Sequence, residues 1–361
     1  MMNKDKVLSI RDLSISFQTS AGEVNAIRGV NLDLYQGETL AIVGESGSGK
    51  SVTVKAIMGI LSGNGKVKSG TIDFTSRKSG EEMKEELLSF SKKEMRRRIN
   101  GRRIAMVFQD PMTSLNPTMP IGSQIMEGMR YHYKTNKKEA YEKAVKLLDL
   151  VGITEPEKRM KSYPHQLSGG MRQRVVIAIA LSCDPEILIC DEPTTALDVT
   201  IQAKILELIK DIQKKTGISV IYITHDLGVV AKVADYVAVM YAGKVVEKGL
   251  SEEIFYDPRH PYTWGLLSAM PDLDTHDEVL YTIPGSPFNL LNKTEGDAFA
   301  ERNRFALNID YRLEPPMFQV TETHYAATWL LHENAPAVSM PEALKDRIKR
   351  MGEEVNSLGG E

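Results

Sequence analysis

Hydrophobic and polar positions alternate over residues 7 to 43, and the alternation ends in an uninterrupted apolar run, TLAIVG. A period of two predicts strands with one buried face, and the closing apolar run predicts a strand buried on both faces. Residues 50 to 61 then carry apolar side chains at helical spacing, followed by a Gly-Asn-Gly stop at 63 to 65. The pattern predicts a strand, a glycine-rich loop and a helix in succession.

The pattern changes twice in the middle of the chain. Residues 76 to 103 are almost wholly charged, which predicts a surface helix inserted between strands. Seven Lys or Arg residues fall within 92 to 103, and such a run is typical of a solvated face, with contact to phosphate or acidic lipid as the alternative. A short strand at 104 to 109 follows, and residues 121 to 182 have the helical spacing of a compact helical block.

Strands and helices alternate again in the second half. Apolar strands are expected in EILICDE, ISVIYITHD, YVAVMYAG and KVVEKG, with a helix over 200 to 215. Strands separated by helices of this length favour parallel pairing with right-handed crossovers. Beyond about residue 250 the sequence becomes Pro-rich and less periodic, and after 341 it predicts a short charged amphipathic helix. We therefore place the main boundary near residue 250.

The composition is that of an ordinary globular protein. Of the 361 residues 42% are hydrophobic and 26% charged, which excludes disordered and collagen-like classes. The net charge of −3 provides no overall attraction to nucleic acid. Cys183 and Cys190 lie in apolar surroundings, as buried thiols in a reducing compartment would. Neither a signal peptide nor a membrane-spanning run is recognisable, so we expect a cytosolic chain that meets a membrane only through a partner.

The sequence GESGSGKS at 44 to 51 satisfies G-x-x-x-x-G-K-[ST] between the predicted buried strand and helix. Gly47 and Gly49 let the backbone wrap so that its amides point inward at phosphate, and the start of the helix adds partial positive charge. Lys50 would reach the β- and γ-phosphates and Ser51 would be a Mg²⁺ ligand. The alternative is a tight turn that matches by chance. The residues expected at the nucleotide are Gly44, Glu45, Ser46, Gly47, Ser48, Gly49, Lys50, Ser51 and Val52.

A second candidate site is ILICDE at 187 to 192, a buried strand that ends in two adjacent acids. Its geometry would turn one carboxylate towards a metal and the next towards water. Asp191 would then orient the Mg²⁺ shell, and Glu192 would polarise the attacking water as a general base. The alternative is a helix-capping acid pair, which the accompanying phosphate loop makes less favourable.

A third segment, LSGGMRQR at 167 to 174, resembles the signature motif of ABC-type ATPases. With Gln109 at the end of IAMVFQ, TTALD at 194 to 198 and His225 in ITHD, the motifs follow the ABC order. The resemblance implies an α/β P-loop NTPase with a RecA-like core, an antiparallel β subdomain and a helical subdomain. The expected divisions are a nucleotide-binding domain at 1–250 with its helical subdomain at about 111–182, a C-terminal extension at 251–335 and a tail at 336–361.

The resemblance also implies how ATP is bound and hydrolysed. ATP would lie between the phosphate loop of one subunit and the signature Ser168, Gly169 and Gly170 of a second. Phe17 would stack on adenine, although a strand aromatic also suits a core. The implied catalytic residues are Glu192, His225 and Gln109, the implied Mg²⁺ ligands are Ser51, Gln109 and Asp191, and Asp198 would couple the two sites.

Among ABC proteins the sequence is most similar to the ATPases of oligopeptide and dipeptide importers, closest to the oligopeptide D-type branch. The spacing from Gln109 to Ser168 leaves no room for the long coiled coil of chromosome-maintenance relatives, and a single phosphate loop disfavours the duplicated translation-factor type. The similarity covers about residues 5 to 335. The segments that carry it are VFQDPMTSLNPTMPIGSQI, YPHQLSGGMRQRV, DPRHPYTWGLLSAMP and IPGSPFNLL.

The resemblance implies a set of partners at the cytoplasmic face of the cell membrane. These are two transmembrane permease subunits, contacted near residues 109 to 122, a homologous second ATPase subunit and, indirectly, an extracellular peptide-binding protein, with no nucleic acid. Two alternatives stay open. One is the same role for another solute, such as a dipeptide, a nickel chelate, glutathione or a cationic peptide. The other is a soluble ABC switch that acts on nucleic acid or the ribosome, suggested by the basic run at 92 to 103.

One departure from the family pattern lies in the extension. Many relatives carry four cysteines there, and some of these bind an iron-sulfur cluster. Here the matching positions are Asp297, Asn303, Asp310 and Thr328, before the expected Trp329 and Leu330. Because no thiolate stands at any of the four, we expect no iron-sulfur cluster.

Overall fold

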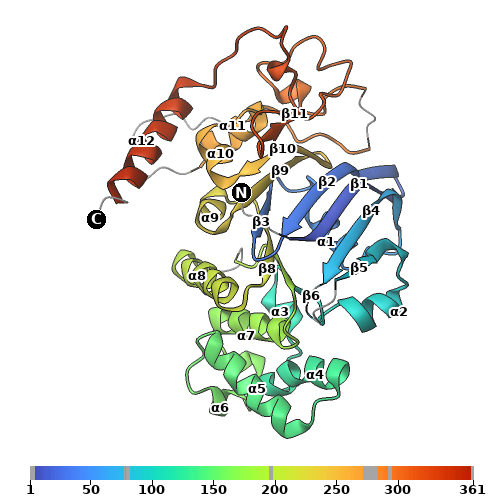
Figure 1. Cartoon of the computed structure of the whole chain (residues 1–361), viewed down its shortest axis with the longest axis vertical. Helices are drawn as coiled ribbons and strands as arrows, with labels where there is room; N and C mark the ends of the chain where they lie inside the picture. The colour runs from blue at the N-terminus through green and yellow to red at the C-terminus, as the bar shows by residue number, and fades with distance from the viewer. Residues whose placement is uncertain are drawn as a thin grey trace.

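The computed structural model describes residues 5–76, 78, 82–194, 198–270, 283–291 and 295–358, without the side chains of Met112 and of residues 352–358. Figure 1 shows two sheets in the middle of the molecule, a block of helices at one end and the C-terminal extension at the other. Among the described residues, no helix is long and apolar enough to cross a membrane.

The N-terminal region forms an antiparallel sheet in the order β2-β1-β4-β5. Its strands are β1 (Lys6–Thr19), β2 (Gly22–Tyr35), β4 (Gly65–Ser76) and β5 (Met83–Glu86). Leu8 and Ile10 of β1 are buried, and after a register shift between Ile10 and Leu13 so are Leu13 and Ile15, which is the period-two pattern of the sequence. This sheet is the antiparallel β subdomain that the sequence analysis expected.

The central sheet has the order β11-β12-β10-β9-β3-β8-β7-β6. The pairs β6–β7, β7–β8, β8–β3 and β3–β9 are parallel, as predicted. The strand β10 runs antiparallel to β9, because the two-residue turn Ala242–Gly243 leaves no room for a crossover. The strands are β3 (Thr39–Val43), β6 (Ile104–Val107), β7 (Ile187–Asp191), β8 (Ser219–Thr224), β9 (Tyr236–Tyr241), β10 (Lys244–Leu250), β11 (Phe318–Gln319) and β12 (Tyr325–Ala326).

The two faces of the central sheet belong to different hydrophobic clusters. Alternate residues such as Leu188 and Cys190 pack with the helical block, whereas Ile187 and Ile189 pack with the antiparallel sheet. The helices of the block are α3 (Pro111–Ser114), α4 (Ile121–Tyr133), α5 (Lys137–Leu150), α6 (Pro156–Arg159), η3 (Pro164–Gln166) and α7 (Gly169–Leu181). The other core helices are α1 (Lys50–Ile57), α8 (Val199–Thr216) and α9 (Leu227–Val233). Cys183 and Cys190 are both buried, as expected.

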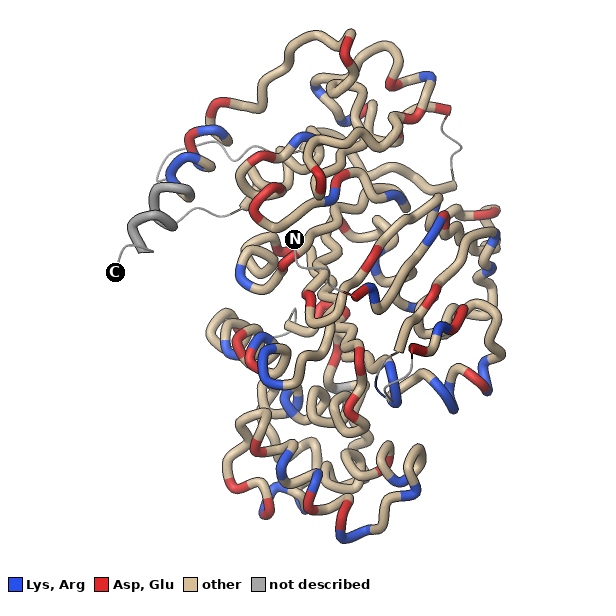
Figure 2. Tube along the Cα trace, in the orientation of Figure 1, with Lys and Arg blue, Asp and Glu red and all other residues tan. Residues whose placement is uncertain are grey.

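The charged segment 76 to 103 differs from the predicted surface helix. It contains the strand β5, paired with β4, then η1 (Leu87–Ser89), α2 (Lys92–Glu94) and the π-helix η2 (Met95–Ile99). Met95 and Ile99 are buried in the core while the Lys and Arg side chains between and before them are exposed. Figure 2 shows these basic residues along the rim beside α2. The two apolar anchors are four positions apart in the sequence, so only one helical turn is needed to bury them.

The extension after residue 250 packs directly on the central sheet. It comprises α10 (Ser251–Tyr256), α11 (Pro261–Ser268), η4 (Ala300–Arg302), β11, β12, η5 (Trp329–Leu331) and the tail helix α12 (Glu342–Leu358). One hydrophobic cluster joins Val43 and Val239 of the core strands with Tyr262, Trp264 and Phe299 of the extension. The strand β12 also pairs with β10. The extension therefore shares a core with the sheet that carries the phosphate loop.

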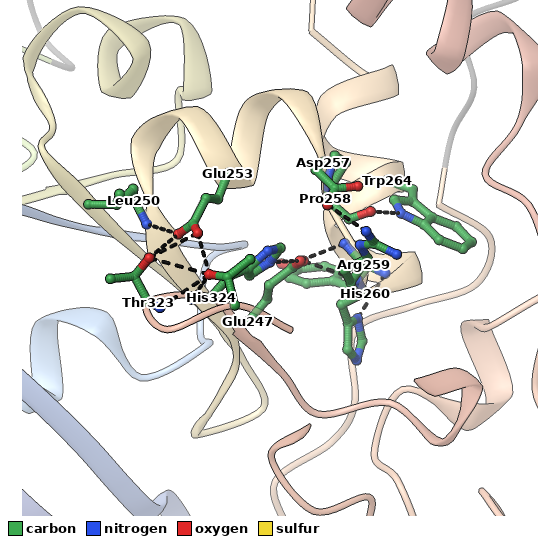
Figure 3. A network of polar contacts seen from close by, with 12 residues as sticks. Glu247, Leu250, Glu253, Asp257, Pro258, Arg259, His260, Trp264, Thr323 and His324 are labelled. Carbon is green, nitrogen blue, oxygen red and sulfur yellow. Dashed lines mark hydrogen bonds and ion pairs between the residues drawn. The ribbon is translucent and has the colours of Figure 1, made fainter. Parts of the chain in front are cut away.

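A buried carboxylate holds the extension at this junction (Figure 3). Glu247 of β10 accepts hydrogen bonds from the backbone amides of Arg259, at 2.6 Å, and His260, at 3.1 Å. Its Oε1 also lies 2.8 Å from Nε2 of His324, and both side chains are 0% exposed. One side chain thus joins the start of α11 and the end of the β11–β12 hairpin to the central sheet.

The substitution Glu247→Ala is expected to destabilise the protein by about 3 kcal/mol, because it leaves two backbone amides, one of them buried, and a buried imidazole without their acceptor. The midpoint of urea unfolding measures the effect. Glu252→Ala, at an exposed position of α10, is the matched control and should change stability by less than about 0.5 kcal/mol. Equal effects of the two substitutions would contradict the assignment.

Candidate nucleotide site

The phosphate loop, residues 44–51, runs from the end of β3 into the first turn of α1 and lies tightly against the neighbouring strand. Gly44, Gly47 and Gly49 have φ values of 145°, 81° and 107°, which side chains rarely allow. A Cβ on Gly44 would lie 2.1 Å from the carbonyl oxygen of Met240, and one on Gly49 would lie 2.7 Å from Ile27 Cδ1. Gly44 and Gly49 are required by this close approach and Gly47 by its φ value alone, and together they leave the loop backbone free to cradle an anion.

Lys50 lies inside the loop with its side chain buried. Its Nζ donates to the carbonyl oxygens of Gly44, at 2.7 Å, and Glu45, at 2.9 Å. Burial lowers the pKa of Lys50, and the nearby carboxylates of Glu192 and Asp191 partly oppose this. The hydroxyl of Ser48 is also buried and, within the described residues, has no hydrogen-bond partner. A buried cation and an unpartnered hydroxyl in a glycine cradle fit a phosphate group.

Ser51 and Asp191 form a pair that suits a magnesium ion. The Ser51 hydroxyl donates to Asp191 Oδ1 at 2.9 Å across the junction of α1 and β7. Burial raises the pKa of Asp191 above its ordinary value, and the hydrogen bond from Ser51 only partly opposes this. A hydroxyl and a carboxylate side by side are hard oxygen ligands of the kind Mg²⁺ prefers. Within the described residues no group of three or more His, Cys, Asp or Glu side chains could hold a metal ion.

Glu192 is the centre of the second acid site. Gln109 Nε2 donates to its Oε2 at 3.1 Å, and His225 Nδ1 lies 3.4 Å from its Oε1. The three residues follow β6, β7 and β8, whose carboxyl ends meet at one edge of the parallel sheet. Glu192 has φ 48°, an unusual backbone conformation for a residue with a side chain. The structure therefore brings together the three residues predicted to be catalytic, with the amide of Gln109 directed at Glu192.

The signature residues lie at the start of α7, in the helical block. Ser168 is the N-cap of α7, and its hydroxyl accepts from the Met171 amide at 3.3 Å. Ser168 and Gly169 are exposed, whereas a Cβ on Gly170 would lie 2.8 Å from Cγ2 of Ile201 in α8. Gly170 thus has a packing role within this chain, and the first two residues present an open helix start to solvent.

The remaining predicted site residues lie at the borders of this region. Asp198 caps α8 by accepting from the Ile201 amide at 3.0 Å, while residues 195–197 of TTALD lie outside the described residues. Phe17 of β1 is half-buried and packs over its partner Gly65, where a Cβ would lie 2.6 Å from its ring. Val52 is half-buried on α1 and packs against the same cluster as Phe17. The adenine-stacking role of Phe17 stays a prediction.

Two residues that touch the phosphate loop were missed by the sequence analysis, because both come from the extension. The Tyr262 hydroxyl accepts from the Glu45 amide at 2.8 Å. The Arg302 guanidinium pairs with the Glu45 carboxylate at 2.6 and 3.0 Å. Tyr262 belongs to the HPYT segment, so a sequence signal was present, but nothing in the sequence showed that it reaches the loop.

The four extension positions that carry cysteine in many relatives are turn-stabilising polar residues here. Asp297, Asn303 and Thr328 each accept a hydrogen bond from the backbone amide two residues later, at 3.0, 2.9 and 3.3 Å. Asp310 accepts from the Leu307 amide at 2.6 Å. Short polar side chains commonly close turns in this way. Each of these side chains is thus engaged with its local backbone.

Asp297→Asn is expected to stabilise the protein in a pH-dependent way. Burial, together with the Asp310 carboxylate, raises the pKa of Asp297 from 3.8 to about 6. Between about pH 4 and 6 the folded state therefore holds a proton that the unfolded chain releases, and this contribution to stability is lost as pH rises through 6. Asparagine keeps the acceptor for Phe299 and removes the buried charge.

Thermal unfolding at two pH values measures this effect. The melting temperature of Asp297→Asn should exceed that of the wild type by a few degrees at pH 7.5, about 1 to 2 kcal/mol, and match it at pH 4. The matched control is Glu301→Gln at an exposed position of η4, which should change neither value. A stabilisation that is the same at both pH values would contradict the charge argument.

Sequence comparisons match two families along the chain. Residues 27–195 match the family described as ABC transporter, and residues 246–309 match the oligopeptide/dipeptide transporter C-terminal region. The chain is 57% identical to the oligopeptide transport ATP-binding protein OppD of Bacillus subtilis (strain 168), over 97% of this chain and 96% of the relative. It is 53% identical to the dipeptide transport ATP-binding protein DppD of Lactococcus lactis subsp. cremoris (strain MG1363), over 98% of this chain and 99% of the relative.

The fold is also similar to solved structures. One is a dimeric post-hydrolysis state of the ATP-binding cassette MJ0796 bound to ADP and Pi, with a TM-score of 0.58 and 25% identity. The match covers 68% of this chain and 98% of the cassette chain. Another is cbiO1 from Clostridium perfringens, part of an ABC transporter complex, with a TM-score of 0.57, 31% identity and coverage of 70% and 92%.

Proposed function

Because this chain belongs to the family of oligopeptide and dipeptide ABC transporter ATP-binding proteins, we propose that it energises oligopeptide uptake across the cytoplasmic membrane by hydrolysing ATP. The observation that carries the proposal is the convergence, at one edge of the central sheet, of the phosphate loop, the Ser51–Asp191 pair and the Glu192 group. The relatives named for oligopeptides and dipeptides support a peptide as the solute.

In this proposal residues 44–52 hold the triphosphate. Loop amides and Lys50 bind the β- and γ-phosphates, and Lys50 exchanges its carbonyl partners for phosphate oxygens. Ser51 and Asp191 would hold Mg²⁺, with Gln109 joining them when it leaves Glu192; bound there, the ion neutralises phosphate charge. The half-buried Phe17 supplies the face for adenine.

Glu192 is the general base of the proposed reaction. It takes a proton from the water that attacks the γ-phosphorus, and the bond from that phosphorus to the bridging oxygen breaks to leave ADP and phosphate. Gln109 and His225 orient the Glu192 carboxylate, and the exposed imidazole of His225 is free to turn towards the γ-phosphate. Proton transfer of this kind requires a carboxylate within hydrogen-bond reach of the water.

The signature residues Ser168, Gly169 and Gly170 act on the nucleotide of a second, homologous ATPase subunit. Their support is the exposed start of α7, which belongs to the helical block and not to the loop side of this chain. The similar cassette bound to ADP and Pi is dimeric. Asp198, at the exposed start of α8, couples the two sites.

The proposed role as the ATPase of an importer implies further partners. Two permease subunits bind near residues 109 to 122, where Gln109 leads into the helical block, and a peptide-binding protein acts on their outer side. The chain is peripheral at the cytoplasmic face and needs neither nucleic acid nor an iron-sulfur cluster. The division is a nucleotide-binding domain at 1–250 with the helical subdomain at about 111–182, an extension at 251–335 and a tail at 336–361.

Two substitutions separate binding from chemistry. Glu192→Gln is expected to keep ATP binding while slowing hydrolysis by about 10² to 10⁴-fold, because the amide cannot accept the proton. Lys50→Ala should weaken ATP binding itself, since it removes the charge in the loop. Nucleotide affinity and steady-state turnover are measured for both; wild-type turnover in Glu192→Gln would refute the base assignment.

Purification of the tagged chain from gently solubilised membranes tests the partners. We expect two polytopic membrane proteins and a second ATPase subunit, with turnover stimulated by peptide-loaded binding protein. The same material, prepared anaerobically, should contain no stoichiometric iron. Stimulation by a binding protein loaded with another solute would reassign the substrate, and recovery of ribosomes or nucleic acid without membrane partners would overturn the importer.

A further inference from the structure

We propose that Arg302 of the C-terminal extension is a positioning residue for ATP binding, because it neutralises and orients the Glu45 carboxylate of the phosphate loop. The inference rests on the proposed role of residues 44–52 in holding the triphosphate. It gives the extension a direct part in the nucleotide site, in addition to its structural contacts with the sheet.

The Arg302 side chain is buried and fixed from several directions. It is 6% exposed, and its two terminal nitrogens pair with the two oxygens of Glu45 at 2.6 and 3.0 Å. Its Nε donates to the carbonyl oxygen of Pro284 at 2.8 Å, and NH1 lies 3.4 Å from the Tyr241 hydroxyl. A two-point Arg–carboxylate pair sets orientation as well as charge. The guanidinium therefore holds Glu45 in one position.

The backbone of Glu45 is held by the extension as well. Its amide donates to the hydroxyl of Tyr262, whose side chain in α11 is fully buried. Its carbonyl oxygen accepts from Nζ of Lys50. Glu45 is thus fixed at its side chain and amide by the extension, and before nucleotide binds its carbonyl oxygen also holds the lysine that would bind the phosphates.

The segment that carries these contacts lies beside the loop. A cavity of 180 Å³ is lined by Ser46, Gly47 and Ser48 on one side and by residues 287–290 on the other. The Phe288 amide donates to the Tyr241 hydroxyl at 3.2 Å, the same hydroxyl that lies near Arg302. Residues 283–291 and η4 therefore approach the phosphate loop together.

The charge of Glu45 explains why this pairing affects ATP. An unpaired carboxylate one residue into the loop would repel the phosphates, and in a partly buried site that repulsion is weakly screened. Arg302 offsets this charge and holds both carboxylate oxygens at its guanidinium. Loss of Arg302 should weaken ATP binding more than it slows the chemical step.

The experiment compares steady-state hydrolysis of MgATP by the purified transporter complex carrying substitutions in this chain. Arg302→Gln is expected to raise KM for MgATP about tenfold and change kcat less than twofold, because Glu192 is untouched. Adding Glu45→Gln to Arg302→Gln removes the unpaired charge and should return KM most of the way to the wild-type value. A merely structural anchor would give a double variant no better than the single one.

Glu314→Gln is the matched control. Glu314 pairs with Arg28, at 2.9 Å, and with Lys244, so it also ties the extension to the core by an ion pair, but neither partner belongs to the phosphate loop. Its KM should stay at the wild-type value, and melting temperatures report the general loss of stability in each variant. A KM that rises equally in Glu314→Gln and Arg302→Gln would overturn the inference.

Lys50→Ala distinguishes failure of this inference from failure of the proposed function. Weakened nucleotide binding in Lys50→Ala with an unchanged KM in Arg302→Gln would overturn only the role of Arg302. Wild-type KM and turnover in Lys50→Ala would overturn the proposed phosphate site and, with it, this inference.

Discussion

The parallel register of the central sheet is the constraint on which the site depends. Val43 pairs with Thr224, Asp191 with Ile223 and Val107 with Cys190, so β3, β8, β7 and β6 end at one edge. The residues that follow these strands then meet without being close in sequence. This is the general reason why open parallel sheets carry their sites at the carboxyl ends of the strands. A slip of one residue in any pair would turn the side chains to the other face.

The two faces of that sheet connect the site to different parts of the molecule. One face packs against the helical block, whose α7 begins at the signature residues, and the other packs against the antiparallel sheet and α1. A third cluster joins β3 and β9 to the extension. The strands that carry the nucleotide site thus pack directly against each of the three regions. A change in nucleotide occupancy at the sheet edge acts on all three through this packing, which is what coupling ATP hydrolysis to a partner requires.

The extension is integrated with the nucleotide site more closely than its irregular sequence suggested. Glu247 of β10 fixes the extension through hydrogen bonds to the amides of Arg259 and His260. Tyr262 and Arg302 of the extension in turn contact Glu45 of the phosphate loop. A buried carboxylate is unfavourable unless each of its oxygens has partners, so this junction tolerates few alternative arrangements. The phosphate loop consequently has a second layer of support that comes from about 250 residues later in the chain.

The sequence by itself determined the strand–loop–helix order of the phosphate loop, the buried strand that ends in Asp191 and Glu192, and the parallel alternation of the core. Local period, glycine placement and motif spacing are properties of neighbouring residues, so they can be read without a structure. The prediction of one surface helix over 76 to 103 was wrong. The density of charge suggested a helix, but the segment forms a strand and a single helical turn anchored by Met95 and Ile99. Only the tertiary structure placed Gln109 and His225 on Glu192, and Arg302 and Tyr262 on Glu45. Those pairs depend on which strands are neighbours and on how the extension folds back, and such long-range packing leaves no periodic signal in the chain.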